Sequence, residues 1–171
     1  MITKTGTWLV KASSIDEEQL RLLMEASSSG DFENGYVIGN VPSRAFRGLQ
    51  KMRVTNKDGK PYPFKVPKLY VPPKGVEHIK EKRLDWDKYH PDKVHEMLRN
   101  LLTNPEVKAV LSRHEARPSG MLVAPSTLSI RNVDVMSVYP DENGMVNFTT
   151  VYDPPSADLH TRILAPKKKQ K

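Results

Sequence analysis

The sequence contains no cysteine, and this absence excludes several kinds of site at once. Without thiols the chain can form no disulfide bond, no thiolate nucleophile and no cysteine-based zinc or iron–sulfur centre. It also has no apolar run near the ~18 residues that span a bilayer, and its first residues lack the apolar core of a signal peptide. We therefore expect a protein of the cytoplasm that has no membrane partner.

Internal repeats and the glycine pattern of a nucleotide-binding loop are also missing. What is present is a chain of 171 residues, 37% hydrophobic and 27% charged, which is the balance of a globular protein with its own core. This length fits one domain. We expect a single α+β domain over residues 1–166, with a mainly antiparallel sheet and helices packed on one face.

Helix signals occur at four places. Ser14 and Glu17 have the spacing of a capping box, and Ser43 is a suitable N-cap before a short amphipathic segment. Pro91 fits the first position of a helix, and Asn104 with the following proline suggests a further start. Apolar residues follow each start at helical spacing. We expect helices from residue 14 to about 29 and at 44–50, 91–102 and 104–116.

Strands are indicated by β-branched and aromatic residues between turn signals. Asn143 and Gly144 close a loop that predicts a hairpin between the last two strands. We expect strands at 7–11, 35–39, 121–124, 128–139 and 145–152.

Residues 51–74 concentrate positive charge, proline and aromatic rings. This stretch contains seven lysines and arginines and one acidic residue, so its net charge is +6. The formal net charge of the whole chain is +7. Asp58 and Gly59 predict a tight turn between extended arms at 53–55 and 61–70. The five prolines exclude a helix and a central strand but permit an edge strand or polyproline segment. We expect a basic hairpin or arm.

In an extended arm, alternate residues from Tyr62 to Tyr70 share one face. Rings interleaved with lysines suit a polyanion that carries stackable bases. The same rings suit an arm that lies on a protein partner or on the protein's own core.

Two further groups of basic residues add to the positive charge of residues 51–74. Arg44 and Arg47 lie at i, i+3 on the short helix before the arm, and the lysine-rich tail at 167–171 should be disordered in isolation. The candidate nucleic-acid-binding residues are Arg44, Arg47, Lys51, Arg53, Lys57, Lys60, Tyr62, Phe64, Lys65, Lys68, Tyr70, Lys74, Lys167, Lys168 and Lys169.

One short segment offers catalytic chemistry. Glu115 as base, His114 as acid and Arg117 on the phosphate would suffice for metal-free RNA cleavage, because the 2′-hydroxyl supplies the nucleophile. His114 also falls on the apolar stripe of the helix expected there, so a histidine at the edge of the core is the competing interpretation.

The segment 76–89 is dense in charge, and we expect a connector with one turn of helix. Asp85, Asp87, His90 and His95 lie close together in sequence at no known metal-binding spacing, so we predict no metal and no cofactor. The sequence favours a non-enzymatic protein that binds single-stranded nucleic acid or RNA with low sequence specificity. The alternatives are a viral or phage structural or inhibitory protein that docks on a protein partner through the arm, and the ribonuclease.

Overall fold

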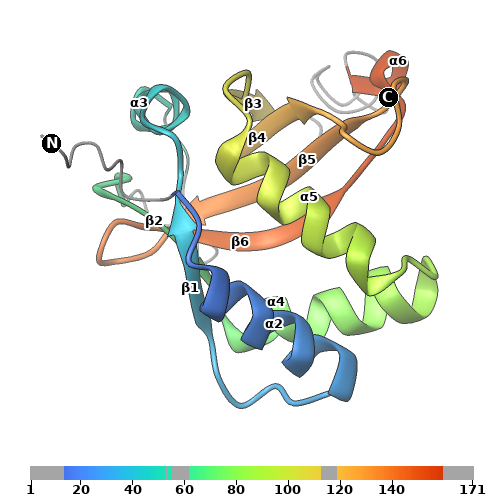
Figure 1. Cartoon of the computed structure of the whole chain (residues 1–171). Helices are drawn as coiled ribbons and strands as arrows, with labels where there is room; N and C mark the ends of the chain where they lie inside the picture. Colours follow the sequence, from blue (N-terminus) through green and yellow to red (C-terminus); the bar gives the residue numbers. More distant parts are fainter. Residues whose placement is uncertain (1–13, 53, 55–61, 113–118, 160–171) are drawn as a thin grey trace, which may run out of the picture.

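Six strands form one mixed sheet in the order β1-β2-β6-β5-β4-β3 (Figure 1). The computed structural model describes residues 14–52, 54, 62–112 and 119–159. The strands are β1 (Tyr36–Asn40), β2 (Val66–Val71), β3 (Lys108–Ser112), β4 (Ser119–Pro125), β5 (Val133–Pro140) and β6 (Met145–Tyr152). The helices are α2 (Glu17–Ser29), α3 (Ser43–Gln50), α4 (Pro73–His78), the π-helix η1 (Ile79–Trp86), α5 (Pro91–Thr103) and α6 (Ser156–Asp158).

Antiparallel pairing dominates the sheet. Neighbouring strands run antiparallel except β2 and β6, which are parallel. The parallel pair joins the antiparallel strands β1 and β2 to the β3–β6 meander, so all six strands belong to one sheet. The α+β class expected from the sequence is therefore confirmed.

The helices α2 to α5 share one hydrophobic core with the sheet. Their apolar residues pack with alternate residues of the strands, such as Leu122, Met136 and Phe148. The residues between these in β4 and β5, such as Met121 and Val135, belong to a smaller cluster that includes Leu159. The four helices therefore cover one face, and Figure 1 shows α5 crossing in front of the strands.

Several expected elements are confirmed. The strand at 145–152 coincides with β6, and the helix at 91–102 is α5, with Pro91 at its start. The hairpin loop ends at Gly144, whose φ of 81° favours glycine. In that loop the Asp141 carboxylate accepts hydrogen bonds from the backbone amides of Asn143 and Met145.

The exclusion of a central strand from the proline-rich stretch is wrong. β2 lies inside the sheet, between β1 and β6. The pairing of β2 with β6 shifts register between Val66 and Leu69. The backbone N–H that Pro67 lacks is therefore not required for a regular hydrogen bond between these strands. The Pro67 carbonyl instead accepts from the Val41 amide at 2.7 Å.

The helix expected at 104–116 is also wrong, because residues 108–112 form β3. The Asn104 side chain accepts from the Glu106 amide at 2.8 Å, and this turn ends the helical path. β3 then pairs along its whole length with β4, from Lys108 opposite Val123 to Ser112 opposite Ser119. A short apolar run fits the periodicity of a helix as well as that of a strand, and here pairing with β4 makes it a strand.

Two helix starts differ from expectation. Asp16, not Ser14, caps α2, and its side chain accepts from the Gln19 amide. The Ser14 carbonyl is held by the Asn40 amide beside β1, which keeps Ser14 outside the helix. α3 already begins at Ser43, after Pro42.

The connector expected at 76–89 is mostly helical. α4 continues directly into η1, which is eight residues long. In a π-helix the backbone bonds run from residue i to i+5, and such segments are frequent at functional sites. The first expected strand at 7–11, the turn at 56–59 and the tail at 167–171 lie outside the described residues.

Candidate catalytic cluster and nucleic-acid interface

A close contact between α4 and β6 positions His78. Gly75 allows this approach, because a Cβ atom there would lie 2.9 Å from the Phe148 ring and 3.0 Å from Val71. Val76 and Ile79 are fully buried on either side of the helix junction. His78, the last residue of α4, thereby reaches β6 two residues beyond Phe148, at Thr150.

The π-helix places Arg83 on the same side as His78. In an α-helix these two residues would point about 140° apart. In η1 the backbone hydrogen bonds run from residue i to i+5, as from the Lys82 carbonyl to the Asp87 amide. Residues five apart, such as His78 and Arg83, therefore lie on the same side of the helix. Both side chains therefore converge on the same strand.

The two side chains meet at one hydroxyl group. The His78 Nε2 atom and the Arg83 Nη2 atom each lie 2.7 Å from Thr150 Oγ1. Arg83 also donates through Nη1 to the Asp87 carboxylate, and its guanidinium carbon lies 5.7 Å from the centre of the Tyr152 ring. The buried Nε atom of Arg83 has no hydrogen-bond partner within the described residues. The guanidinium is thus fixed in place by these contacts.

Burial lowers the pKa of His78, and the positive charges of Arg83 and Lys82 lower it further. Asp87 acts in the opposite direction but more weakly. Because the ordinary value is 6.5, His78 is mainly neutral at pH 7. The cluster therefore combines an imidazole able to accept a proton with a fixed cation and a hydroxyl group.

A second polar network holds the chain just after Tyr152. Asp153, whose side chain is only 8% exposed, accepts from the Tyr89 hydroxyl at 2.8 Å and pairs with Lys93 at 3.1 Å. Burial and the Asp153 hydrogen bond raise the pKa of Tyr89 well above its usual range. The Asp153 carbonyl accepts from the Asn132 side chain. These contacts tie the segment between η1 and α5, α5 itself and the end of β6 together next to the cluster.

Exposed basic residues lie on α3, at β2 and on α4. Six of the predicted nucleic-acid-binding residues are exposed, and none forms an ion pair with another described residue. They come from α3, from the segment that leads into β2, from β2 itself and from α4. They are Arg44, Arg47, Lys51, Lys65, Lys68 and Lys74. Lys74 lies four residues before His78, on the same face of α4.

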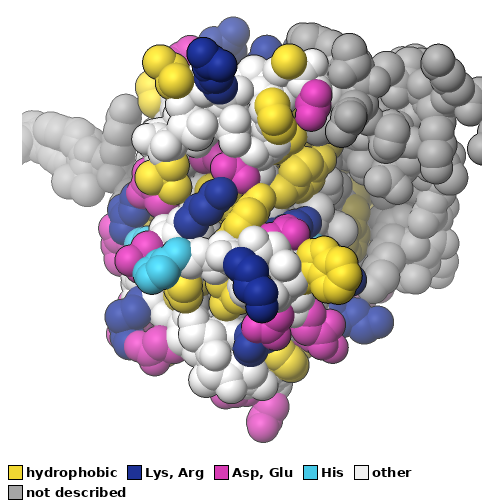
Figure 2. All heavy atoms as spheres, turned by 90° about the vertical axis from the view of Figure 1, so that its right-hand side faces the viewer, with side chains coloured by type: hydrophobic (Ala, Val, Ile, Leu, Met, Phe, Trp, Pro, Cys, Tyr) yellow, Lys and Arg dark blue, Asp and Glu magenta, His cyan; other side chains and the backbone are white. Residues whose placement is uncertain are grey.

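The side where η1 passes into α5 differs in charge. Figure 2 shows basic and acidic side chains interspersed there, with hydrophobic side chains visible between them. Lys80 pairs with Asp85, and Arg83 with Asp87. Lys80 and Arg83 are therefore paired with acids, in contrast to the exposed basic residues of α3 and β2.

The aromatic rings of the predicted arm are less available than expected. Phe64 is buried and 3% exposed, so its proposed stacking on a base is wrong for this structure. Tyr62 and Tyr70 are half-buried, and Tyr70 packs so closely on Gly35 that a Cβ atom there would collide with its hydroxyl. Phe64 and Tyr70 thus serve largely as packing.

The remaining predicted residues cannot be placed. The nucleic-acid-binding candidates Arg53, Lys57, Lys60, Lys167, Lys168 and Lys169 lie outside the described residues, as do the catalytic candidates His114, Glu115 and Arg117. Sequence reasoning missed His78, Arg83 and Thr150. The spacing of His78 and Arg83 fits no α-helical face, and Thr150 is 72 residues from His78, so no local pattern joins them.

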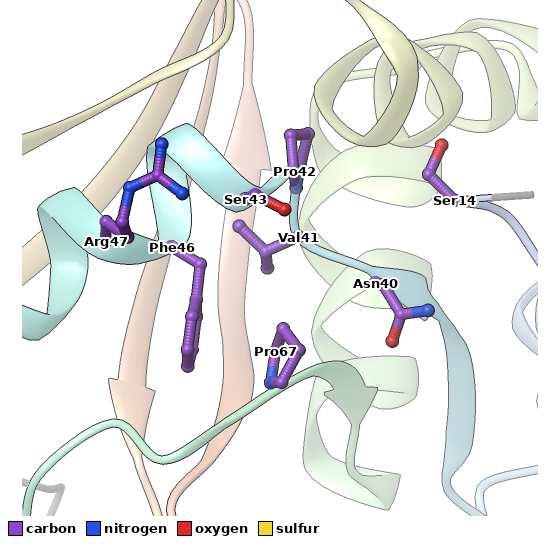
Figure 3. A pocket seen from close by; sticks show the side chains of 8 residues that line it. All are labelled: Ser14, Asn40, Val41, Pro42, Ser43, Phe46, Arg47 and Pro67. Carbon is purple, nitrogen blue, oxygen red and sulfur yellow. The ribbon is translucent and has the colours of Figure 1, made fainter. Parts of the chain in front are cut away.

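A hollow of about 490 Å³ opens near the exposed basic residues of α3. Its wall comes from the end of β1, from α3 and from Pro67 in β2, with Arg47 at the side (Figure 3). Phe46 and Val41 are its most deeply buried lining residues. It is lined by residues other than those of the His78 cluster.

In the described ranges, no three His, Asp or Glu side chains are arranged to hold a metal ion. No described helix has both the length and the apolar character needed to cross a membrane. Comparisons with protein families, with curated proteins and with solved structures find no match to this chain.

Proposed function

We propose that the protein binds RNA and cleaves it without a metal ion, using His78, Arg83 and Thr150. The observation that carries this proposal is the convergence of a neutral imidazole and a fixed guanidinium on one hydroxyl oxygen, each at 2.7 Å. A histidine whose pKa is lowered by burial and by a neighbouring cation is one of the features that mark candidate functional sites. Metal-free RNA cleavage was one of the alternatives from the sequence, but there it was assigned to His114, Glu115 and Arg117.

The cluster supplies the groups that RNA cleavage needs. In the proposed step the 2′-hydroxyl takes the position at His78 Nε2 that Thr150 Oγ1 holds in the free protein. Nε2 accepts the hydroxyl proton, the 2′ oxygen bonds to phosphorus, and the bond to the 5′ oxygen breaks. The proton then passes from the imidazolium through water to the leaving 5′ oxygen.

Arg83 and Thr150 act on the phosphate. The guanidinium stabilises the extra negative charge of the pentavalent phosphorane. Once displaced from Nε2, the Thr150 hydroxyl donates to a phosphate oxygen. Asp87 and Tyr152 hold Arg83 in place, so little reorganisation accompanies the reaction.

The exposed basic residues bind the rest of the RNA strand. Lys74 provides a phosphate contact beside His78, and the exposed Lys65 and Lys68 add positive charge at β2. Binding of this kind releases counterions, so log K should fall against log salt with a slope of about −0.7 for each phosphate neutralised. A second candidate function, RNA binding without cleavage, is favoured by these same unpaired charges.

Paired variants separate the two functions. We expect His78→Ala to lower the cleavage rate on the order of 10²–10⁴-fold while RNA affinity is retained. His95→Ala, a half-buried histidine on α5, is the matched control and should leave the rate unchanged. Thr150→Val should lower the rate, whereas Thr149→Val, at an exposed neighbour, should not.

Charge reversal tests binding. Lys65→Glu with Lys68→Glu should weaken RNA binding and reduce the salt slope. The control, Lys108→Glu with Arg131→Glu, makes the same change in net charge at exposed residues elsewhere. RNA binding without any cleavage would leave only the second candidate, and no binding at low salt would exclude both.

A further inference from the structure

The hollow beside α3 has walls that are fixed before any ligand arrives. The Val41 amide bonds to the Pro67 carbonyl at 2.7 Å, and the Asn40 amide bonds to the Ser14 carbonyl at 2.8 Å. These two bonds tie β1 to β2 and to the segment before α2. Pro42 and Pro67 add rigid rings to the wall (Figure 3). The volume of about 490 Å³ lies within the usual range for small-molecule sites.

The lining combines apolar rings with a few polar groups. Phe46, Pro42 and Pro67 provide apolar surface, and the Phe46 ring is the aromatic one. Asn40 contributes an amide that both donates and accepts, and Ser14 and Ser43 contribute hydroxyl groups. A flat heterocycle with apolar faces and a polar edge has complementary chemistry.

Arg47 adds a positive charge at the side of the hollow. Its side chain is exposed and forms no ion pair with any other described residue, and Lys68 lies opposite Asn40 in the β1–β2 pairing. Guanidinium groups bind phosphates well because their donors form a planar fork. The hollow thus offers an aromatic ring for the face of a base, polar groups for its edge and a cation for a phosphate.

We infer that this hollow binds one nucleotide of an RNA strand, with the base against Phe46 and the phosphate at Arg47. The inference rests on the proposed function and adds a base-binding subsite to it. The hollow lies by the start of β2, which pairs near Met145, whereas the cluster lies at Thr150. At about 3.3 Å per residue, five residues of β6 separate the two by roughly 17 Å. A dinucleotide is therefore too short to occupy both.

Binding of mononucleotides tests the subsite directly. The probes are AMP, GMP, CMP and UMP, with ribose 5-phosphate and inorganic phosphate as controls that lack the base, titrated into the full chain and followed by amide NMR shifts. We expect at least one nucleotide to shift the amides of Asn40, Val41 and Phe46 and to bind at least tenfold more tightly than ribose 5-phosphate. Equal binding of nucleotide and ribose 5-phosphate, or no shift at these amides, would overturn the inference.

Variants confirm the location. Asn40→Ala should weaken nucleotide binding at least threefold, and so should Arg47→Ala. Arg131→Ala, at an exposed arginine that does not line the hollow, should not. Phe46→Leu keeps apolar packing while removing the ring, and it should also weaken binding. Unchanged nucleotide affinity in both Asn40→Ala and Arg47→Ala would assign the shifts to another site.

Cleavage kinetics distinguish this inference from the proposed function. Asn40→Ala should raise KM for an RNA of ten nucleotides without lowering kcat, and it should leave dinucleotide cleavage unchanged. If wild type cleaves RNA and nucleotides leave these amides unshifted, the subsite fails and the proposed function stands. If nucleotides bind in the hollow but RNA is not cleaved, the subsite stands as part of an RNA-binding surface.

Discussion

The His78 Nε2 atom lies 2.7 Å from the Thr150 hydroxyl oxygen, and this contact joins α4 to β6 across 72 positions of the chain. The same oxygen accepts from Arg83. When the imidazole is neutral with its proton on Nδ1, the Thr150 hydroxyl donates to Nε2. The protonation state of His78 is therefore coupled to both neighbours, and its consequences can be measured.

The first prediction concerns pH. Because burial and Arg83 lower the pKa of His78, the base form is lost only below its ordinary value of 6.5. We expect kcat/KM for RNA cleavage to rise with pH through a midpoint below 6.5 and then to level off. Arg83→Gln should move this midpoint upward, in addition to lowering the plateau. A rate that falls as pH rises from 5 to 7 would contradict the role of His78 as base.

The second prediction concerns Gly75. Replacing an exposed helical glycine by alanine usually stabilises a protein. Here the new methyl group would press on Phe148 and Val71, so we expect Gly75→Ala to lower the free energy of unfolding by about 1–3 kcal/mol. RNA cleavage should fall as well, because α4 carries His78. Chemical denaturation measures the first effect, with Ser28→Ala on the exposed face of α2 as control. A stabilised and fully active Gly75→Ala variant would contradict the close approach.

The third prediction concerns Asp134, a buried carboxylate on β5. Burial raises the pKa of Asp134 to about 6, against the opposing hydrogen bond from Asn100 at 2.8 Å. Because the folded pKa exceeds the ordinary value of 3.8, the stabilising contribution is complete below pH 3.8 and is lost as pH rises through 6. The loss amounts to up to about 3 kcal/mol.

Denaturation at several pH values checks the role of Asp134. Asp134→Asn removes the titration, so the free energy of unfolding of this variant should decline less than that of wild type between pH 4.5 and 7.5. The difference between the two curves isolates this group from other titrating residues. Parallel curves would show that Asp134 has an ordinary pKa.

The fourth prediction uses Trp86, which is 79% exposed at the end of η1, three residues after Arg83. Exposed rings near a nucleic-acid site provide surfaces on which bases stack. In a Trp8→Phe variant, Trp86 is the only tryptophan left. We expect its fluorescence to be quenched by single-stranded RNA and not by inorganic phosphate. Unchanged emission at saturating RNA would place the strand away from η1.

The sequence predicted those elements whose signals are local. Pro91 and the apolar spacing after it define α5, and the Asn143–Gly144 turn defines the hairpin before β6. β3 could not be separated from a helix, because its five residues fit either period until the β4 partner is known. Pro67 argued against an inner strand, and only the register shift shows how the sheet accommodates it.

The candidate site was less predictable than the fold for a related reason. Charge is visible in sequence, and Arg44, Arg47, Lys65 and Lys68 are exposed in the structure, while their role in binding stays a prediction. Burial of Phe64 depends on tertiary packing, so composition could not predict it. The His78 and Arg83 pair depends on a π-helix, which helical periodicity does not anticipate.

The most direct test of the central claim is cleavage of a DNA oligonucleotide that contains a single ribonucleotide, in the presence of EDTA. Wild type is predicted to cut only on the 3′ side of that ribonucleotide and to leave a 2′,3′-cyclic phosphate, identified by mass spectrometry. His78→Ala should not cut, and His95→Ala should cut like wild type. Cleavage of the all-DNA control, or equal cleavage by His78→Ala, would contradict the account.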